Sequence, residues 1–195
     1  MNFIIISAAL KNGLEAFKNN IVAYLVGLLI LIIATCLCVL IIPILLIAPL
    51  LYGYINMAVK GSRGEKVEIG DMFIGLKSIS AFIRSWMYFI VYFVVLIIIA
   101  IISALLVKVS PFLSIIGTLL ALIWAFIAFF SIYIYVMSSK NSISAYKEGF
   151  SVLTGNLLMT IITFIIFFVL CIFLITIPIA TVFTATVLKA LKPGI

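Results

Sequence analysis

The stretch SWMYFIVYFVVLIIIAIISALLV, residues 85–107, contains 23 residues and no charged side chain. An α-helix needs roughly 20 mainly apolar residues to cross the ~30 Å hydrocarbon core of a bilayer. This run is therefore long enough for one crossing. Further uncharged runs occupy residues 19–59, 109–139 and 149–188. The first and the last of these runs are about twice the length that one crossing needs, so each is expected to hold two spans.

Proline residues divide the two longest runs, because proline donates no backbone hydrogen bond and disfavours helix in the residue before it. Pro43 and Pro49 lie in the first run, and Pro178 lies in the last. The sequence predicts an all-α, polytopic membrane bundle with about six transmembrane helices arranged in three hairpins. The predicted spans are residues 21–41, 44–60, 85–107, 111–138, 156–176 and 178–191.

The composition indicates that nearly the whole chain lies in the membrane. Of its 195 residues, 68% are hydrophobic and 9% are charged, which is far from the balance of soluble domains. We therefore expect a single integral membrane domain over residues 1–195. The net charge of +7 belongs to clusters that flank the apolar runs, so the predicted partners are membrane lipids, including anionic headgroups, and not nucleic acid.

The basic residues indicate an orientation in the cell membrane. With six spans, the predicted topology leaves Lys108 alone on one side and places every other lysine and arginine on the opposite side. The positive-inside rule then puts both termini in the cytoplasm. Tyrosines near the cytoplasmic span ends, such as Tyr88 and Tyr135, are expected in an aromatic belt. The residues predicted to lie at the interface are Lys11, Lys18, Lys77, Arg84 and Lys147.

An internal repeat emerges where the chain approaches its first and fifth spans. Two segments match at an offset of 136 residues, so that Gly13 corresponds to Gly149 and Asn20 to Asn156. Their apolar positions follow helical spacing and predict amphipathic helices that lie in the headgroup plane. Both asparagines suit the N-caps of the following spans. The two apolar stripes are Leu10, Leu14, Phe17 and Ile21, and Tyr146, Phe150, Leu153 and Leu157.

A weaker third copy precedes the third span, where Met72, Leu76, Ile79 and Ile83 form the stripe. We therefore predict interfacial amphipathic helices before spans 1, 3 and 5. The repeat units would cover about residues 1–60, 69–140 and 141–195. Such repeats occur in transporters, where sites form between the units. They also arise where duplication supplies more hydrophobic surface, which is the interpretation that we favour here.

Groups for catalysis are scarce in this chain. It has no histidine, and no aspartate or glutamate falls inside a predicted span, which removes the usual proton shuttles, carboxylate pairs and most zinc arrangements. Cys36, Cys38 and Cys171 lie in apolar runs and are interpreted as buried free thiols. The sequence predicts no catalytic, cofactor-binding or metal site, no cofactor and no enzymatic activity.

Small residues follow one face of the fourth predicted span at spacings of 4, 4 and 3. Residues this small allow two helices to approach closely within a membrane. The predicted helix-packing residues are Gly117, Ala121, Ala125 and Ala128. Their partner is either another helix of this chain or a second subunit, so self-association is one outcome of this pattern.

Short motifs resemble a known group of membrane proteins. The segments Asp71-Met72-Phe73, Gly75-Leu76 and Lys147-Glu148-Gly149, together with the basic turn before Asp71, resemble six-span prokaryotic membrane families of unknown function. Those families are similar to the membrane domain attached to some glycerophosphodiester phosphodiesterases. The phosphodiesterase domain is missing here, so the resemblance carries no catalytic residue and implies only an integral membrane protein.

The sequence thus favours a non-enzymatic membrane protein that acts through its lipid-facing and cytoplasmic interfacial surfaces, with self-association as one mode. The alternative is a pore or facilitator for a small neutral or amphipathic solute, and an embedded enzyme comes third. Clustering of the serine and threonine hydroxyls along one path would favour a pore. Dispersed hydroxyls that bond to their own helices would favour the first function.

Overall fold

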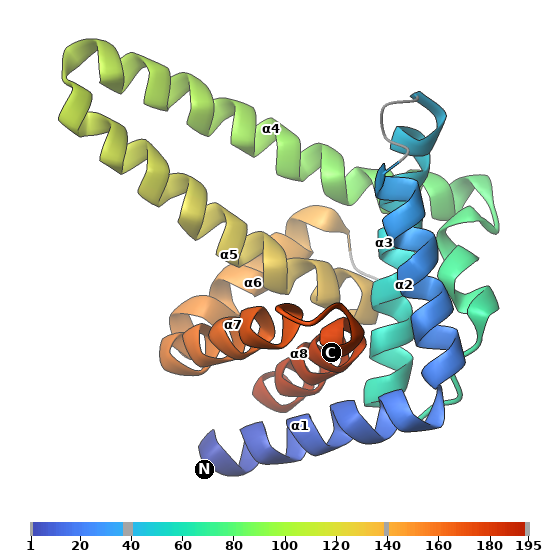
Figure 1. The fold of residues 1–195 in the computed structure, drawn as a ribbon. Helices are drawn as coiled ribbons and strands as arrows, with labels where there is room; N and C mark the ends of the chain where they lie inside the picture. The colour runs from blue at the N-terminus through green and yellow to red at the C-terminus, as the bar shows by residue number, and fades with distance from the viewer. Residues whose placement is uncertain (1, 37–40, 139–140, 194–195) are drawn as a thin grey trace.

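The computed structural model describes residues 2–36, 41–138 and 141–193. Every regular element in these ranges is a helix, which confirms the all-α class (Figure 1). In chain order the elements are α1 (Asn2–Asn19), α2 (Ile21–Cys36), α3 (Ile41–Ser62), η2 (Ile69–Leu76), α4 (Ile79–Val109), η3 (Pro111–Leu113), α5 (Ser114–Ser138), α6 (Ser142–Gly155), α7 (Leu157–Cys171), η4 (Leu174–Thr176) and α8 (Ile177–Leu191).

Helices α4 and α5 form a long hairpin that projects away from the other helices (Figure 1). They contain 31 and 25 residues, and both are apolar and long enough to cross a membrane. None of the most apolar stretch of α4 is buried against protein, and 28% of that of α5 is. Ser78 starts α4 cleanly, because its Oγ accepts a hydrogen bond from the Ala81 amide at 3.1 Å. The predicted spans 85–107 and 111–138 both lie in this hairpin.

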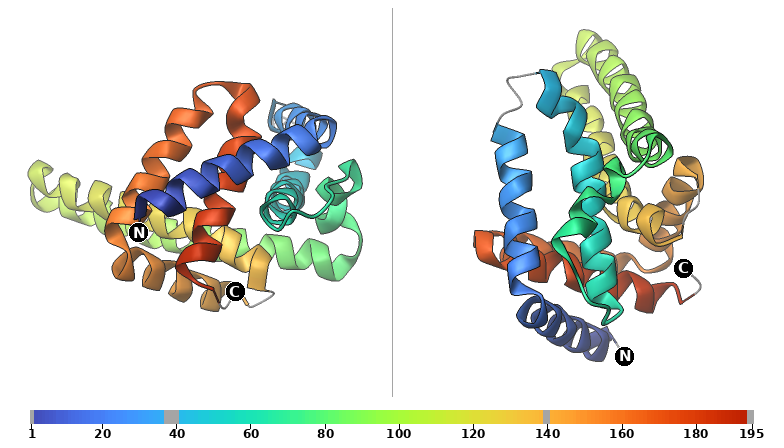
Figure 2. Two further views of the ribbon diagram at one scale, coloured as in Figure 1. Left: turned by 90° about the horizontal axis from the view of Figure 1, so that it is seen from below. Right: turned by 90° about the vertical axis from the view of Figure 1, so that its right-hand side faces the viewer.

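Two sharply bent helix pairs flank the hairpin in the chain. The axes of α1 and α2 differ by 91° at Asn20, and those of α6 and α7 differ by 105° at Asn156. Figure 2 shows both bends. If each bent pair is one broken span, the described residues hold four candidate spans instead of two. The helices expected before the first and fifth predicted spans are therefore present, although the structure does not show six crossings.

Asn156 takes the N-cap position of α7, as predicted, but neither asparagine caps the following helix through its side chain. The Asn20 side chain turns away from α2: its Nδ2 donates to the Ala16 carbonyl at 3.1 Å, and its Oδ1 accepts from the Val67 amide at 2.9 Å. Asn156 precedes α7 without a capping side-chain bond. The Asn20 side chain instead bonds to backbone groups of α1 and of the α3–η2 turn.

In both α1 and α6, a glycine lies on the face that packs against another helix. A Cβ atom on Gly13 would lie 2.9 Å from the Ile179 carbonyl oxygen of α8. A Cβ atom on Gly149 would lie 3.0 Å from the Ile127 carbonyl oxygen of α5 and would overlap Ser131. In contrast, Leu14 and Phe150 from the predicted apolar stripes are exposed. Gly13 and Gly149, which correspond to each other in the predicted repeat, each allow a close helix contact.

The third predicted amphipathic helix does not form as one element. Residues 69–76 form the 3₁₀ helix η2, and α4 begins at Ile79, so the stripe breaks between them. Met72 is fully buried, whereas Ile79 and Ile83 are exposed. η2 folds back along α3 because two glycines allow the backbones to touch: a Cβ on Gly53 would overlap Met72, and one on Gly75 would lie 2.6 Å from the Pro49 carbonyl oxygen.

Helix α8 occupies the centre of the molecule and packs against α1, α3 and α7. Seven of its residues have no exposed surface: Ala180, Val182, Phe183, Thr184, Ala185, Val187 and Leu188. α8 joins the core built on α1–α3 to the core built on α3–α6. The predicted sixth span, 178–191, is therefore an interior helix covered by protein over much of its surface.

Candidate functional site

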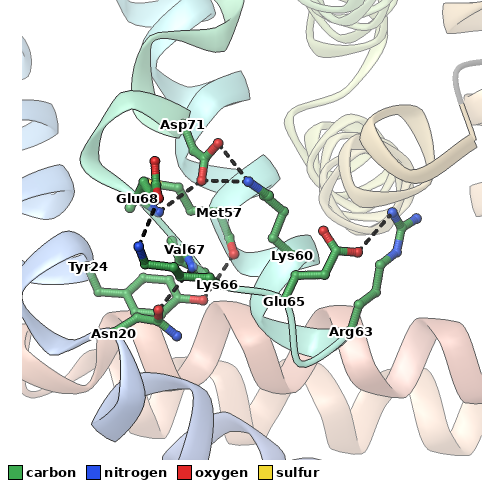
Figure 3. Close-up of polar contacts among 10 residues, drawn as sticks. All are labelled: Asn20, Tyr24, Met57, Lys60, Arg63, Glu65, Lys66, Val67, Glu68 and Asp71. Atoms are coloured by element: carbon green, nitrogen blue, oxygen red, sulfur yellow. Dashed lines mark hydrogen bonds and ion pairs between the residues drawn. The ribbon is translucent and has the colours of Figure 1, made fainter.

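A polar cluster fixes the turn between α3 and η2 (Figure 3). Lys60 Nζ lies 2.9 Å from both carboxylate oxygens of Asp71, and both side chains are mostly buried. Asp71 Oδ2 also accepts from the Glu68 amide at 3.0 Å. Tyr24 donates to the Met57 carbonyl at 3.0 Å. The hydrogen bonds and the ion pair of the Asp71 carboxylate stabilise the turn, so its role is structural.

The most informative side chain lies at the base of the hairpin. Arg84 is half-buried in α4, and its guanidinium carbon is 5.2 Å from the centroid of the Tyr135 ring on α5. Arg84 Nη2 donates to the Tyr135 carbonyl at 3.3 Å, and Tyr135 donates back to the Arg84 carbonyl at 2.7 Å. Among the described residues Arg84 forms no ion pair, although it is one of the least exposed cationic side chains.

A stack of aromatic rings lies next to this arginine, because the Tyr88 ring is 5.5 Å from the Tyr135 ring that Arg84 contacts. Tyr146 of α6 lies between Tyr88 of α4 and Trp124 of α5, with ring centroids 4.9 and 4.7 Å apart. Tyr88 donates to the Ala128 carbonyl at 2.5 Å, and Tyr146 donates to the Tyr88 carbonyl at 3.2 Å. Each hydroxyl is therefore satisfied by backbone, and the rings join three helices into a rigid base.

Two grooves open on either side of Arg84. The larger, of about 610 Å³, is lined by α4, by Tyr135 and by the first turn of α6, including Ser142 and Ile143. The smaller, of about 310 Å³, lies between α4 and the pair formed by α3 and η2, with Tyr52 and Ile74 in its wall. Arg84 and Ser80 line both grooves. A cationic group is thus held beside apolar walls where the long apolar run of α4 begins.

The sequence identified Arg84 as an interfacial residue but not its surroundings. Tyr88 and Tyr135 were expected in an aromatic belt near the cytoplasmic ends of the spans, and both are buried inside the protein. One signal was available in the sequence: Arg84, Tyr88 and Tyr92 are spaced by four residues, which puts them on one face of a helix. The contribution of Tyr146 carried no such signal, because α6 meets α4 and α5 only through tertiary packing.

The other predicted interfacial residues lie away from the grooves. Lys11, Lys18, Lys77 and Lys147 are all exposed. Lys11 lies 3.9 Å from Glu15 across one turn of α1, with both side chains largely in solvent. These exposed lysines offer diffuse positive charge and no built site.

The predicted packing face of α5 points toward α4 at its two ends. A Cβ on Gly117 would overlap the Ser103 side chain of α4, and Ala128 is buried beneath the Tyr88 hydroxyl. Ala121 and Ala125 are half-buried between them. The contacts of Gly117 and Ala128 are therefore made within this chain.

The cysteine prediction was wrong about burial. Cys36 and Cys171 are free, but Cys36 is exposed and Cys171 is half-buried. Cys38 lies outside the described residues. Within the described ranges no three histidine, cysteine, aspartate or glutamate side chains come together in a way that could hold a metal ion.

Comparisons with known protein families, curated proteins and solved structures give no match for this chain. The resemblance to six-span membrane families therefore stays a prediction, and the function has to be argued from the geometry.

Proposed function

We propose that this chain is a non-enzymatic integral membrane protein that acts through its lipid-facing surface and its cytoplasmic interfacial surface. The observation that carries the proposal is the α4–α5 hairpin, whose apolar side chains remain largely unburied over lengths sufficient to cross a bilayer. Exposed apolar surface of this extent is stable in hydrocarbon and not in water. The Arg84 cluster lies at the base of the same hairpin, where headgroups would meet it.

Charge asymmetry supports the orientation that we propose. Lys108 lies at the tip of the hairpin, whereas Lys77 and Arg84 precede its first long apolar run. An even number of crossings, with the base of the hairpin in the cytoplasm, keeps both termini on that side. The proposal of six crossings is the fullest version of this topology.

The alternative function, a pore, would need hydroxyl groups that face a shared path. Ser103, Thr118 and Thr163 instead donate to carbonyls of their own helices, at 2.7, 3.2 and 2.7 Å. This pattern supports a packing role for the hydroxyls. Self-association remains part of the proposal through the exposed outer faces of α4 and α5.

Alkaline extraction and cysteine labelling test the proposal. In a cysteine-free background, Val109→Cys at the hairpin tip and Lys66→Cys in the α3–η2 turn provide a matched pair of exposed positions. We expect the protein to stay in the membrane pellet, with an impermeant maleimide labelling Val109→Cys but not Lys66→Cys in intact cells. Release of the protein at high pH, or labelling of Lys66→Cys from outside, would refute the proposal.

A further inference from the structure

We propose that the larger groove beside Arg84 binds the phosphate headgroup of an anionic phospholipid, with the acyl chains lying along the exposed face of α4. This inference rests on the proposed function, because it requires the hairpin to be in a bilayer. It adds a defined ligand class and a defined site to that function.

Charge is the first argument. Arg84 holds its guanidinium beside the Tyr135 ring and has no carboxylate partner among the described residues. The hydrogen bond to the Tyr135 carbonyl uses one of the five N–H donors of the side chain. A planar guanidinium with free donors favours phosphate oxygens, which can accept two parallel hydrogen bonds.

The second wall of the groove adds donors. The first turn of α6 lines the groove at Asn141, Ser142 and Ile143. Asn141 Oδ1 accepts a hydrogen bond from the Ser144 amide at 2.8 Å and so caps the helix. The amides of Ser142 and Ile143 precede this bond and have no acceptor within the helix, so with the helix dipole they favour an anion in the groove.

The apolar part of the groove selects a lipid over a water-soluble anion. Ile83, Met87 and Val91 are side chains of α4 that line the same groove as Arg84. Ile83 and Met87 are exposed, and Ile90 and Val94 extend the apolar surface toward the hairpin tip. A volume of about 610 Å³ lies within the roughly 300–1,000 Å³ typical of small-molecule sites. Acyl chains would continue from this groove along a surface that faces hydrocarbon.

Two substitutions test the site, and a third serves as the control. Arg84→Gln removes the cation. Ile143→Glu places a carboxylate in the first turn of α6, where it suits the helix dipole and repels an anion in the groove, and it leaves both Arg84 and Tyr135 unsubstituted. Lys108→Gln removes one positive charge at the exposed hairpin tip, far from the groove in sequence and at the other end of the hairpin.

Binding is measured by native mass spectrometry of the purified protein in a non-ionic detergent. The probes are phosphatidylglycerol, phosphatidylcholine and glycerol 3-phosphate. For the wild type and Lys108→Gln we expect phosphatidylglycerol to bind in preference to the other two probes. For Arg84→Gln and Ile143→Glu we expect phosphatidylglycerol to bind at least about tenfold more weakly, because each loses or opposes a charged hydrogen bond.

The inference requires both groove variants to lose binding while the control retains it. Loss in Arg84→Gln alone would overturn it, since the arginine would then hold only the fold. Equal binding of phosphatidylcholine, or equal competition by glycerol 3-phosphate, would also overturn it. A protein that fails to stay in membranes refutes the proposed function, whereas an integrated protein whose groove variants bind phosphatidylglycerol like the wild type refutes only this site.

Discussion

Adding one methyl group at Gly53 should loosen the contact between α3 and η2. A Cβ at this position would overlap the Met72 carbonyl oxygen and would lie 2.5 Å from its carbonyl carbon and 3.0 Å from its Cα. These are backbone atoms, so no rotamer change relieves the clash. Met72 is itself fully buried, and the Lys60–Asp71 ion pair holds η2 close by.

The magnitude follows from two opposing effects. Overpacking costs typically 1–3 kcal/mol, and we take about 3 because the obstacle is backbone. Alanine is favoured over glycine inside a helix by about 1 kcal/mol, which offsets part of this cost. The net loss for Gly53→Ala is therefore about 2 kcal/mol, or a decrease in Tm of about 4–8 °C for a chain of this size.

Thermal unfolding in detergent, followed by intrinsic fluorescence, measures this change. Gly70→Ala is the matched control within η2, because a Cβ there meets nothing within 4 Å, and we expect it to change stability by less than about 0.5 kcal/mol. If the Tm of Gly53→Ala equals the Tm of Gly70→Ala and of the wild type, the proposed backbone contact is refuted.

Three further predictions concern other contacts. Gly117→Ala should destabilise the hairpin by about 1–3 kcal/mol, and combining it with Ser103→Gly should cost less than the sum of the single changes, as measured in a double-mutant cycle of thermal unfolding. Asp71→Asn should cost about 1–3 kcal/mol, because the Lys60 ammonium loses its charged partner. Removing the exposed charge of Lys11 should leave Tm unchanged within error. Equal Tm values for the two variants would count against a stabilising role for the Lys60–Asp71 pair. Cys171→Ala should retain membrane integration and phosphatidylglycerol binding, and loss of either at unchanged Tm would reveal a role for the thiol.

The local patterns of the chain predict its helices well. The uncharged run 85–107 falls inside α4, and the amphipathic stretches before the first and fifth predicted spans are α1 and α6. These elements depend on length, hydropathy and spacing, which are properties of neighbouring residues. The segment 69–76 differs, because its fold-back depends on Gly53 and Gly75 touching residues far away in the chain.

The candidate site was predictable only in part. The position of Arg84 before a long apolar run indicated an interfacial cation. Its groove also needs Tyr135 from α5 and the first turn of α6, which are brought together by packing that hydropathy does not encode. The same applies to Asn20: the sequence suggested a helix cap, but the 91° bend places its side chain beside the Val67 amide.

The central position of α8 has a consequence during synthesis. Ribosomes add about 5–20 residues per second, so on the order of ten seconds separate the completion of α3 from the completion of α8. Throughout this interval the face of α1 around Gly13 lacks the helix against which it packs, since Ile179 and Phe183 have not yet emerged. A chain that stalls before α8 is made therefore leaves this face of α1 without the helix that covers it in the folded protein.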